Sequence, residues 1–128
     1  MIAVYQKIVD HIFIVSTIFF TVYSQLIMRW QVSSAGSLPS DYSDKFKFIF
    51  SLLINPWVIS GIFSTFLAGV SWMLAMTKFD ISYAFPFVSL NYVIILFAGV
   101  VIYHEPINLM KIIGSLIVVI GIVVLSKG

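Results

Sequence analysis

The sequence predicts an all-α membrane protein with four transmembrane helices joined by short loops. Of its 128 residues, 61% are hydrophobic and only 9% are charged, which leaves too little polar surface to cover a compact soluble domain. A spanning helix needs about 20 mostly apolar residues, and the chain holds four apolar stretches that fit this length. We therefore expect residues 1–128 to form a single four-helix transmembrane domain.

The first span is expected at residues 11–29. It ends at Arg29 and Trp30, a cationic and aromatic pair of the kind found at the lipid–water boundary. Although Lys7 precedes the apolar run, no cleavage site of small residues follows it, so we interpret the segment as a retained helix and not as a signal peptide. Residues 31–47 are rich in Ser, Asp, Gly and Pro, which predicts a polar loop.

Two starting points are open for the second span. Proline is well tolerated in the first turn of a helix and disfavours helix in the residue before it, so Pro56 predicts a span over residues 56–77. The apolar segment 46–53 would then lie at the membrane interface. Alternatively, the span begins at Phe48 and is kinked at Pro56.

The third span is expected at residues 81–103 and the fourth at residues 108–126. Pro86 lies inside the third span and should bend it, with neighbouring helices covering the carbonyl group that proline frees. Four spans place both termini on one side, and Lys and Arg residues are almost evenly divided between the two sides, so they set no orientation. The cationic residues are Lys7, Lys78 and Lys127 on the side of the termini and Arg29, Lys45, Lys47 and Lys111 on the other.

Composition and motifs argue against several classes of function. The absence of cysteine excludes a disulfide, a thiol nucleophile and a cysteine metal site. A net charge of +2 with scattered carriers does not suit nucleic-acid binding. Catalytic triads, nucleotide-binding loops and metal-ligand spacings are absent from the sequence, and His11 and His104 should lie on opposite sides of the membrane. We expect no enzyme activity, no metal and no cofactor.

Small residues recur at helical spacing in two spans. Helices in lipid associate through close packing of small residues and through interhelical hydrogen bonds. Gly61, Thr65 and Gly69 follow one another every four residues in the second span, and Gly114 and Gly121 lie seven apart in the fourth. These stripes predict contacts with neighbouring helices of the same chain or with a second chain.

Polar residues of the first span share one face. Thr21 and Gln25 follow Thr17 at intervals of four residues, and Ser24 lies three residues after Thr21. Hydroxyl groups in a helix commonly bond to its own carbonyls, whereas the amide of Gln25 has donors and an acceptor to satisfy and is the stronger candidate for substrate contact.

The middle of every span lacks Asp, Glu, Lys and Arg, so ionisable side chains are expected at the span ends, where they normally anchor a helix. Among them, Glu105 lies in a tight turn. It is expected to cap the following helix, with substrate binding as the alternative.

These residues resemble the four-helix members of the drug/metabolite transporter superfamily. That superfamily includes EamA-like proteins, small multidrug resistance exporters and two small subunits proposed to flip aminoarabinose-linked undecaprenyl phosphate. The resemblance lies in residues 82–90 (Ser-Tyr-Ala-Phe-Pro-Phe-Val-Ser-Leu), the Glu105-Pro106 turn, the glycines of the last span and Ser24-Gln25-Leu26 followed by Arg29. It covers most of the chain apart from residues 31–47, and His104 stands where the family usually has glycine.

One departure from the family pattern concerns the multidrug exporters. Their first helix bears a membrane-embedded glutamate that exchanges protons for cationic drug, and the corresponding residue here is Thr21, which cannot exchange a proton. The resemblance therefore implies the lipid-linked-sugar branch, located in the bacterial inner membrane.

The implied function is a flippase, or a flippase subunit, for a polyprenyl-phosphate-linked sugar. Arg29 and Lys78, near opposite interfaces, are candidate phosphate partners, and Tyr83 and Tyr92 are candidate sugar contacts. The expected substrate-binding set is Thr21, Ser24, Gln25, Arg29, Lys78, Tyr83, Ser89, Tyr92 and Glu105. Because four helices hardly enclose a path, we expect a homodimer or a heterodimer with a similar four-helix subunit. The alternatives are a homodimeric exporter of small molecules and a non-transporting scaffold subunit of a larger membrane complex.

Overall fold

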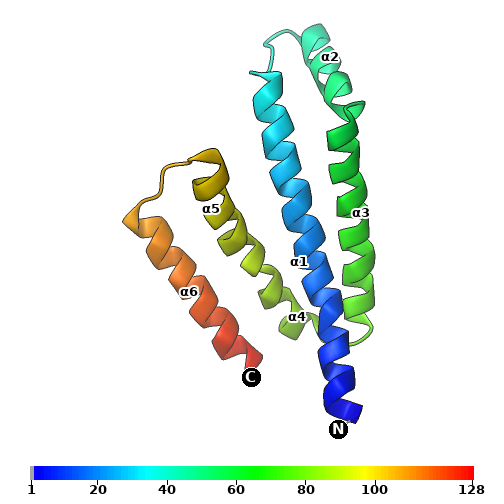
Figure 1. Cartoon of the computed structure of the whole chain (residues 1–128), viewed down its shortest axis with the longest axis vertical. Helices are drawn as coiled ribbons and strands as arrows, with labels where there is room; N and C mark the ends of the chain where they lie inside the picture. Colours follow the sequence, from blue (N-terminus) through cyan, green and yellow to red (C-terminus); the bar gives the residue numbers. More distant parts are fainter. Residues whose placement is uncertain (1) are drawn as a thin grey trace.

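The computed structural model describes residues 2–128, and its regular elements are all α-helices (Figure 1). Four helical segments in this part of the chain are long and apolar enough to cross a membrane, which confirms the expected fold class. The third of these segments consists of two helices. The helices are α1 (Ile2–Ala35), α2 (Tyr42–Leu53), α3 (Pro56–Met76), α4 (Ile81–Val88), α5 (Leu90–Tyr103) and α6 (Leu109–Ser126).

Helix α1 is longer than the expected span of residues 11–29. Its 34 residues give a length of about 51 Å, well beyond a hydrocarbon core of about 30 Å. The expectation of a loop from residue 31 was wrong, because the helix continues to Ala35 and the next one begins at Tyr42. Polar side chains here bond to groups of α1 itself or to Asn55, so they are compatible with helix: Ser34 Oγ donates to Trp30 O at 3.1 Å, and Gln31 Oε1 accepts from Asn55 Nδ2 at 3.1 Å.

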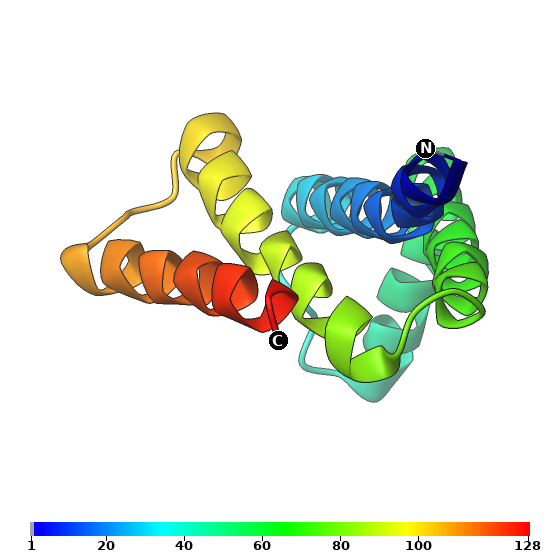
Figure 2. The same cartoon turned by 90° about the horizontal axis from the view of Figure 1, so that it is seen from below.

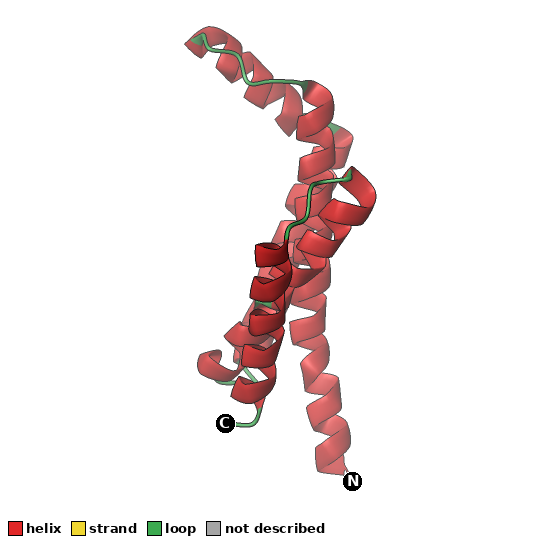
Figure 3. Cartoon of the chain, turned by 90° about the vertical axis from the view of Figure 1, so that its left-hand side faces the viewer, coloured by secondary structure: helices red, strands yellow, loops and turns green. Residues whose placement is uncertain are grey.

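Helix α3 begins at Pro56, and α2 is a separate helix before it, so the alternative of one kinked helix from Phe48 is wrong. Asn55 is extended and caps α3, with its Oδ1 accepting from Trp57 N at 2.8 Å. Proline at the first helical position lacks an amide that would have had no partner there. Helix α2 bends away from the axis of α3 at one end of the molecule (Figure 3).

The third span is divided at Ser89, between α4 and α5. Pro86 lies inside α4, and its missing amide removes a hydrogen bond to the preceding turn. The expected bend is therefore present, and its cause is visible in the sequence. In Figure 2, α6 lies away from the pair formed by α1 and α3, whereas α5 contacts α1.

Helices α1 and α3 form the most extensive contact in the molecule. The buried face of α3 carries mainly small residues, and a Cβ added to Gly61 would meet Met28 Cε at 3.3 Å and the Ser24 carbonyl oxygen at 3.7 Å. Gly61 of the small-residue stripe is thus used within the chain, whereas Gly69 is exposed and a Cβ added to it would meet nothing within 4 Å. The buried residues of α3 are Val58, Gly61, Ser64, Ala68, Ser71 and Ala75.

The glycines of α6 have a different environment. A Cβ added to Gly114 or Gly121 would have no heavy atom of residues 2–128 within 4 Å. The glycine stripe of the fourth span is therefore left open by the rest of the described chain. Large apolar side chains such as Ile117, Ile120 and Val124 are more than half exposed on the same helix, as expected for a helix whose solvent is lipid.

The α1–α3 contact leads to a stability prediction. Substituting Leu for Gly61 forces a large side chain against α1, and overpacking of this kind costs about 1–3 kcal/mol. We expect Gly61→Leu to lower the free energy of unfolding measured by SDS titration in mixed micelles. Gly114→Leu is the matched control, since it gains the same helix propensity at an open position. Equal stability of the two variants would contradict the packing described here.

Candidate functional site

A stripe of polar residues runs along one face of α1 at intervals of four residues: Thr17, Thr21, Gln25 and Arg29. Twelve residues of helix separate its ends, a length of about 18 Å. Thr17 and Thr21 line a cavity of about 340 Å³ together with residues of α3 and α4, Thr65, Gly69 and Phe85 among them. Gln25 follows as an exposed side chain. The stripe offers hydrogen-bonding groups within an apolar span, although the Thr17 hydroxyl already donates to the carbonyl of Phe13 at 2.8 Å.

Ser24 lies on the adjacent face of α1 and is only 3% exposed. Its hydroxyl forms a hydrogen bond of 2.6 Å with that of Thr65 on α3. A second interhelical bond connects Ser64 Oγ to the carbonyl of Phe20 at 2.7 Å. Ser24 therefore holds α1 and α3 together, and the open side of the stripe is formed by Thr21 and Gln25.

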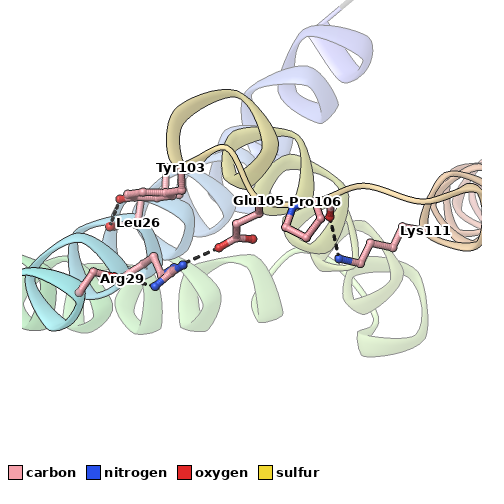
Figure 4. Close-up of polar contacts among 7 residues, drawn as sticks. Leu26, Arg29, Tyr103, Glu105, Pro106 and Lys111 are labelled. Carbon is pink, nitrogen blue, oxygen red and sulfur yellow. Dashed lines mark hydrogen bonds and ion pairs between the residues drawn. The ribbon is translucent and has the colours of Figure 1, made fainter. Parts of the chain in front are cut away.

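Arg29 joins the end of the stripe to the end of α5 (Figure 4). Its Nε donates to Glu105 Oε1 at 3.0 Å, and its Nη1 donates to Ser33 Oγ at 2.6 Å. The guanidinium group lies over the ring of Tyr103, 5.5 Å from the ring centroid. Tyr103 in turn donates its hydroxyl to the carbonyl of Leu26 at 2.7 Å. The guanidinium is thus oriented by three groups while its side chain stays 52% exposed.

Glu105 is placed by the backbone that follows α5. His104 adopts a left-handed conformation (φ 54°), and the amides of His104 and Glu105 both donate to the carbonyl of Gly99. The carboxylate then rests against Gly99, where a Cβ would come within 2.8 Å of Oε2. Only glycine leaves room for the carboxylate at this point.

The expected capping role of Glu105 is wrong. Asn108 caps α6, since its Oδ1 accepts from the amide of Lys111 at 2.9 Å. Lys111 Nζ donates to the carbonyl of Pro106 at 3.1 Å (Figure 4). With Asn108 as the cap, the Glu105 carboxylate is available to Arg29.

Lys78 and Tyr83 lie at the opposite end of the molecule, where they line a cavity of about 610 Å³. The hydroxyl of Tyr83 is 3.0 Å from His11 Nε2, and His11 Nδ1 is 2.6 Å from the carbonyl of Lys7. Because a carbonyl only accepts, Nδ1 is assigned as protonated, and in a neutral ring Tyr83 then donates to Nε2. This bond ties α4 to α1.

Ser89 and Tyr92 are both exposed, and Tyr92 is 53% exposed. Ser89 lies at the break between α4 and α5, where its carbonyl accepts from the amide of Tyr92 at 3.1 Å. The structure does not bring either side chain to the stripe or to the two cavities described above. They remain expectations from the sequence.

Asn91 was missed by the sequence reasoning. Its Oδ1 is buried without a hydrogen-bond partner among residues 2–128. It lies in the first turn of α5, directly after the break at Ser89. A lone amide in an apolar span was the available signal, the same one that singled out Gln25.

Metal-ligating residues do not gather in this structure. In the part of the chain from residue 2 onward, no group of three His, Asp or Glu side chains could hold a metal ion. His11 is bonded to Tyr83 at the start of α4, and His104 follows the end of α5.

The amino-acid sequence matches a known family model over residues 12–127, a range that takes in nearly all of the four apolar helical segments. The chain belongs to the EamA-like transporter family. Together with its four helical segments long and apolar enough to cross a membrane, this makes it a multi-pass membrane protein of that family.

Three curated relatives share part of the EamA-like chain. A probable 4-amino-4-deoxy-L-arabinose-phosphoundecaprenol flippase subunit ArnF of Shewanella sediminis (strain HAW-EB3) is 26% identical over 109 residues, which cover 78% of this chain and 75% of the relative. The ArnE subunit of the same kind of flippase from Pseudomonas aeruginosa (strain UCBPP-PA14) is 27% identical over 75 residues, 59% of this chain and 65% of the relative. That of Enterobacter sp. (strain 638) is 36% identical over 55 residues.

The match to the Enterobacter protein covers 43% of this chain and 51% of the relative. The chain thus spans between about half and two thirds of the length of these two ArnE proteins. No solved structure matches the chain.

The space that Gly99 leaves for the Glu105 carboxylate leads to a second prediction. Gly99→Ala places a methyl group against the Glu105 carboxylate, which must move away from its position beside Arg29. We measure the free energy of unfolding in a double-mutant cycle of Arg29→Gln and Glu105→Gln. In the native background we expect a coupling energy between the two side chains of up to about 1 kcal/mol. In the Gly99→Ala background we expect almost none. Gly114→Ala is the control background and should leave the coupling intact. If the coupling energy is unchanged in Gly99→Ala, the space beside Gly99 does not position Glu105.

Proposed function

We propose that this EamA-like protein is a subunit of a flippase that moves a polyprenyl-phosphate-linked sugar across the bacterial inner membrane. The printed names of the ArnE and ArnF relatives support this class of substrate. The observation that carries the proposal is the stripe of Thr17, Thr21 and Gln25 that ends at Arg29. It combines neutral hydrogen-bonding groups at mid-membrane with one cation at the end.

The chemistry of such a substrate fits the stripe. The sugar hydroxyls lose several kcal/mol each if they enter hydrocarbon without partners, and the side chains of Thr21 and Gln25 supply partners along the way. The lipid tail needs no enclosure, so a path open to the membrane on one side is sufficient. The helix from His11 to Arg29 rises about 27 Å, close to the thickness of the hydrocarbon core of about 30 Å.

Arg29 is the proposed phosphate partner at one end of this path. Charge-assisted bonds from a guanidinium to phosphate oxygens are short and strong, and Tyr103 and Ser33 already orient this guanidinium. The Glu105 carboxylate holds the same group at 3.0 Å. A phosphate that binds to Arg29 would therefore displace the Glu105 carboxylate from the guanidinium group.

A partner subunit is part of the proposal. Gln25 is exposed, and a Cβ added to Gly114 or Gly121 of α6 would meet no side chain and no other helix of the described chain within 4 Å. A second four-helix subunit, either a copy of this chain or a similar protein, would cover these faces and complete the path. A heterodimer is the form that the paired names ArnE and ArnF favour.

The test of this function is translocation in proteoliposomes. We expect the protein, reconstituted with its four-helix partner, to move a labelled polyprenyl-phosphate-linked pentose between leaflets. Arg29→Ala should lower the initial rate at least about tenfold, which corresponds to the loss of one charge-assisted bond of about 1.5–3 kcal/mol. Lys47→Ala on α2 is the matched control, since it removes a cation outside the stripe and should leave the rate unchanged.

Gln25→Leu tests the middle of the path. Leucine has a similar size but offers no hydrogen bond, so the rate should fall while the apparent affinity for the phosphate end stays near that of the native protein. If Arg29→Ala and Gln25→Leu both translocate normally, the assigned path is wrong. Export of a small cation with no movement of the lipid-linked sugar would favour the exporter alternative, and binding to a larger enzyme without transport would favour the scaffold.

A further inference from the structure

The cavity at the end of the molecule opposite Arg29 is large and polar, and the proposed path uses only part of its wall. It measures about 610 Å³ and lies where α1 begins, α3 turns into α4 and α6 ends. Figures 1 and 2 show these three segments at the same end of the molecule. The residues that matter for its chemistry are Lys7, Lys78, Asp80, Ser82 and Tyr83.

The cavity holds both cationic and anionic groups, and Gly128, the last residue of the structure, adds its backbone carboxylate to the charged side chains of the lining. Lys7 and Lys78 contribute two ammonium groups and Asp80 one carboxylate, so the lining side chains sum to +1. Within residues 2–128 the one ion pair is that of Arg29 with Glu105. Both ammonium groups are therefore without a carboxylate at salt-bridge distance, in a setting where lysine usually finds water, lipid phosphate or an acidic partner.

Further hydrogen-bond donors surround these ammonium groups. Asp80 precedes the first turn of α4, but its side chain makes no capping bond, so the amides of that turn are not used by the carboxylate. Such amides carry the positive end of the helix dipole and favour an anion. The hydroxyl of Ser82 stands in the same turn. The cavity thus offers cationic and neutral donors to a ligand rich in acceptor oxygens.

We propose that this cavity is a binding site for a phosphodiester headgroup at the membrane surface. A phosphodiester carries one negative charge, so the carboxylates of the lining repel it less than a phosphomonoester, which carries close to two near neutral pH. Phe79 and Leu125 also line the cavity and provide apolar contact for the first carbons of a lipid. The hydroxyl of Tyr83, held by His11 of α1, connects this wall to the helix that bears the stripe.

Two sources share this chemistry: a membrane phospholipid and the lipid-linked sugar of the proposed function. Binding of a phosphodiester headgroup stands on the cavity alone. Its use as the second phosphate position of a transported lipid rests on the proposed function, with Arg29 at one end of the path and Lys7 and Lys78 at the other.

The binding test uses the purified full chain in detergent, titrated with short-chain phosphatidylglycerol and followed by native mass spectrometry. The double variant Lys7→Gln and Lys78→Gln should retain phosphatidylglycerol about tenfold more weakly. The matched control, Lys45→Gln and Lys47→Gln, removes the same charge from α2 and should bind as the native protein does. If both double variants lose phosphatidylglycerol binding equally, the effect depends on net charge alone and the proposal is overturned. The proposal is also overturned if neither double variant loses binding.

Asp80→Asn keeps the proposal testable if the lysine variant folds poorly. It removes one of the opposing carboxylates, so phosphatidylglycerol should bind about threefold more tightly, a gain that unfolding cannot produce. Unchanged or weaker binding in Asp80→Asn would contradict a site defined by the charges of this cavity.

Competition distinguishes the sources of the headgroup. Water-soluble glycerophosphoglycerol should displace phosphatidylglycerol, while inorganic phosphate at the same concentration should not; displacement by inorganic phosphate would overturn the phosphodiester assignment. Displacement by a polyprenyl-phosphate-linked sugar supports a shared site for the transported lipid. If phosphatidylglycerol binds as expected but the lipid-linked sugar is neither bound nor translocated, the proposed function fails and the headgroup site stands.

Discussion

The close packing of α1 against α3 is the constraint on which the rest of the molecule depends. In lipid there is little hydrophobic gain from joining two helices, so contact requires small residues and interhelical hydrogen bonds. Gly61, Ala68 and Ala75 allow the approach, and the bonds of Ser24 and Ser64 hold it. This contact uses one face of α1 completely. The neighbouring face, with Thr21 and Gln25, is left as the polar surface that the transport proposal requires.

The second half of the chain is tied to α1 by polar bonds near both ends of the third span. At one end Tyr83 bonds to His11, and at the other Tyr103 bonds to Leu26 while Glu105 pairs with Arg29. Between these ties, Pro86 interrupts the helix and the buried oxygen of Asn91 lacks a partner in the described chain. The third span is thus fixed to α1 near both ends and interrupted between them.

Much of the fold follows from local rules that the sequence displays. Hydrophobic length predicts the four spans. Pro56 marks the start of α3, and Pro86 marks the bend in the third span. The predicted end of the first helix was wrong. Hydroxyl and amide side chains in residues 31–35 form hydrogen bonds with α1 itself and with Asn55, and composition does not reveal these partners. The pairing of Arg29 with Glu105 joins residues 76 positions apart, and no local pattern indicates it. The site residues were therefore identified as candidates, but their grouping required the structure.

The distribution of charge bears on the need for a partner. A phosphodiester that crosses the membrane keeps its charge, and an isolated ion in hydrocarbon is very costly. This chain supplies cations only near the two ends of the proposed path, and Thr17, Thr21 and Gln25 between them are neutral. The guanidinium of Arg29 is held by Ser33, one turn nearer the end of α1, and by Glu105. The remaining compensation must come from the face that covers the stripe, so a second subunit would contribute to the substrate path itself and not only to stability.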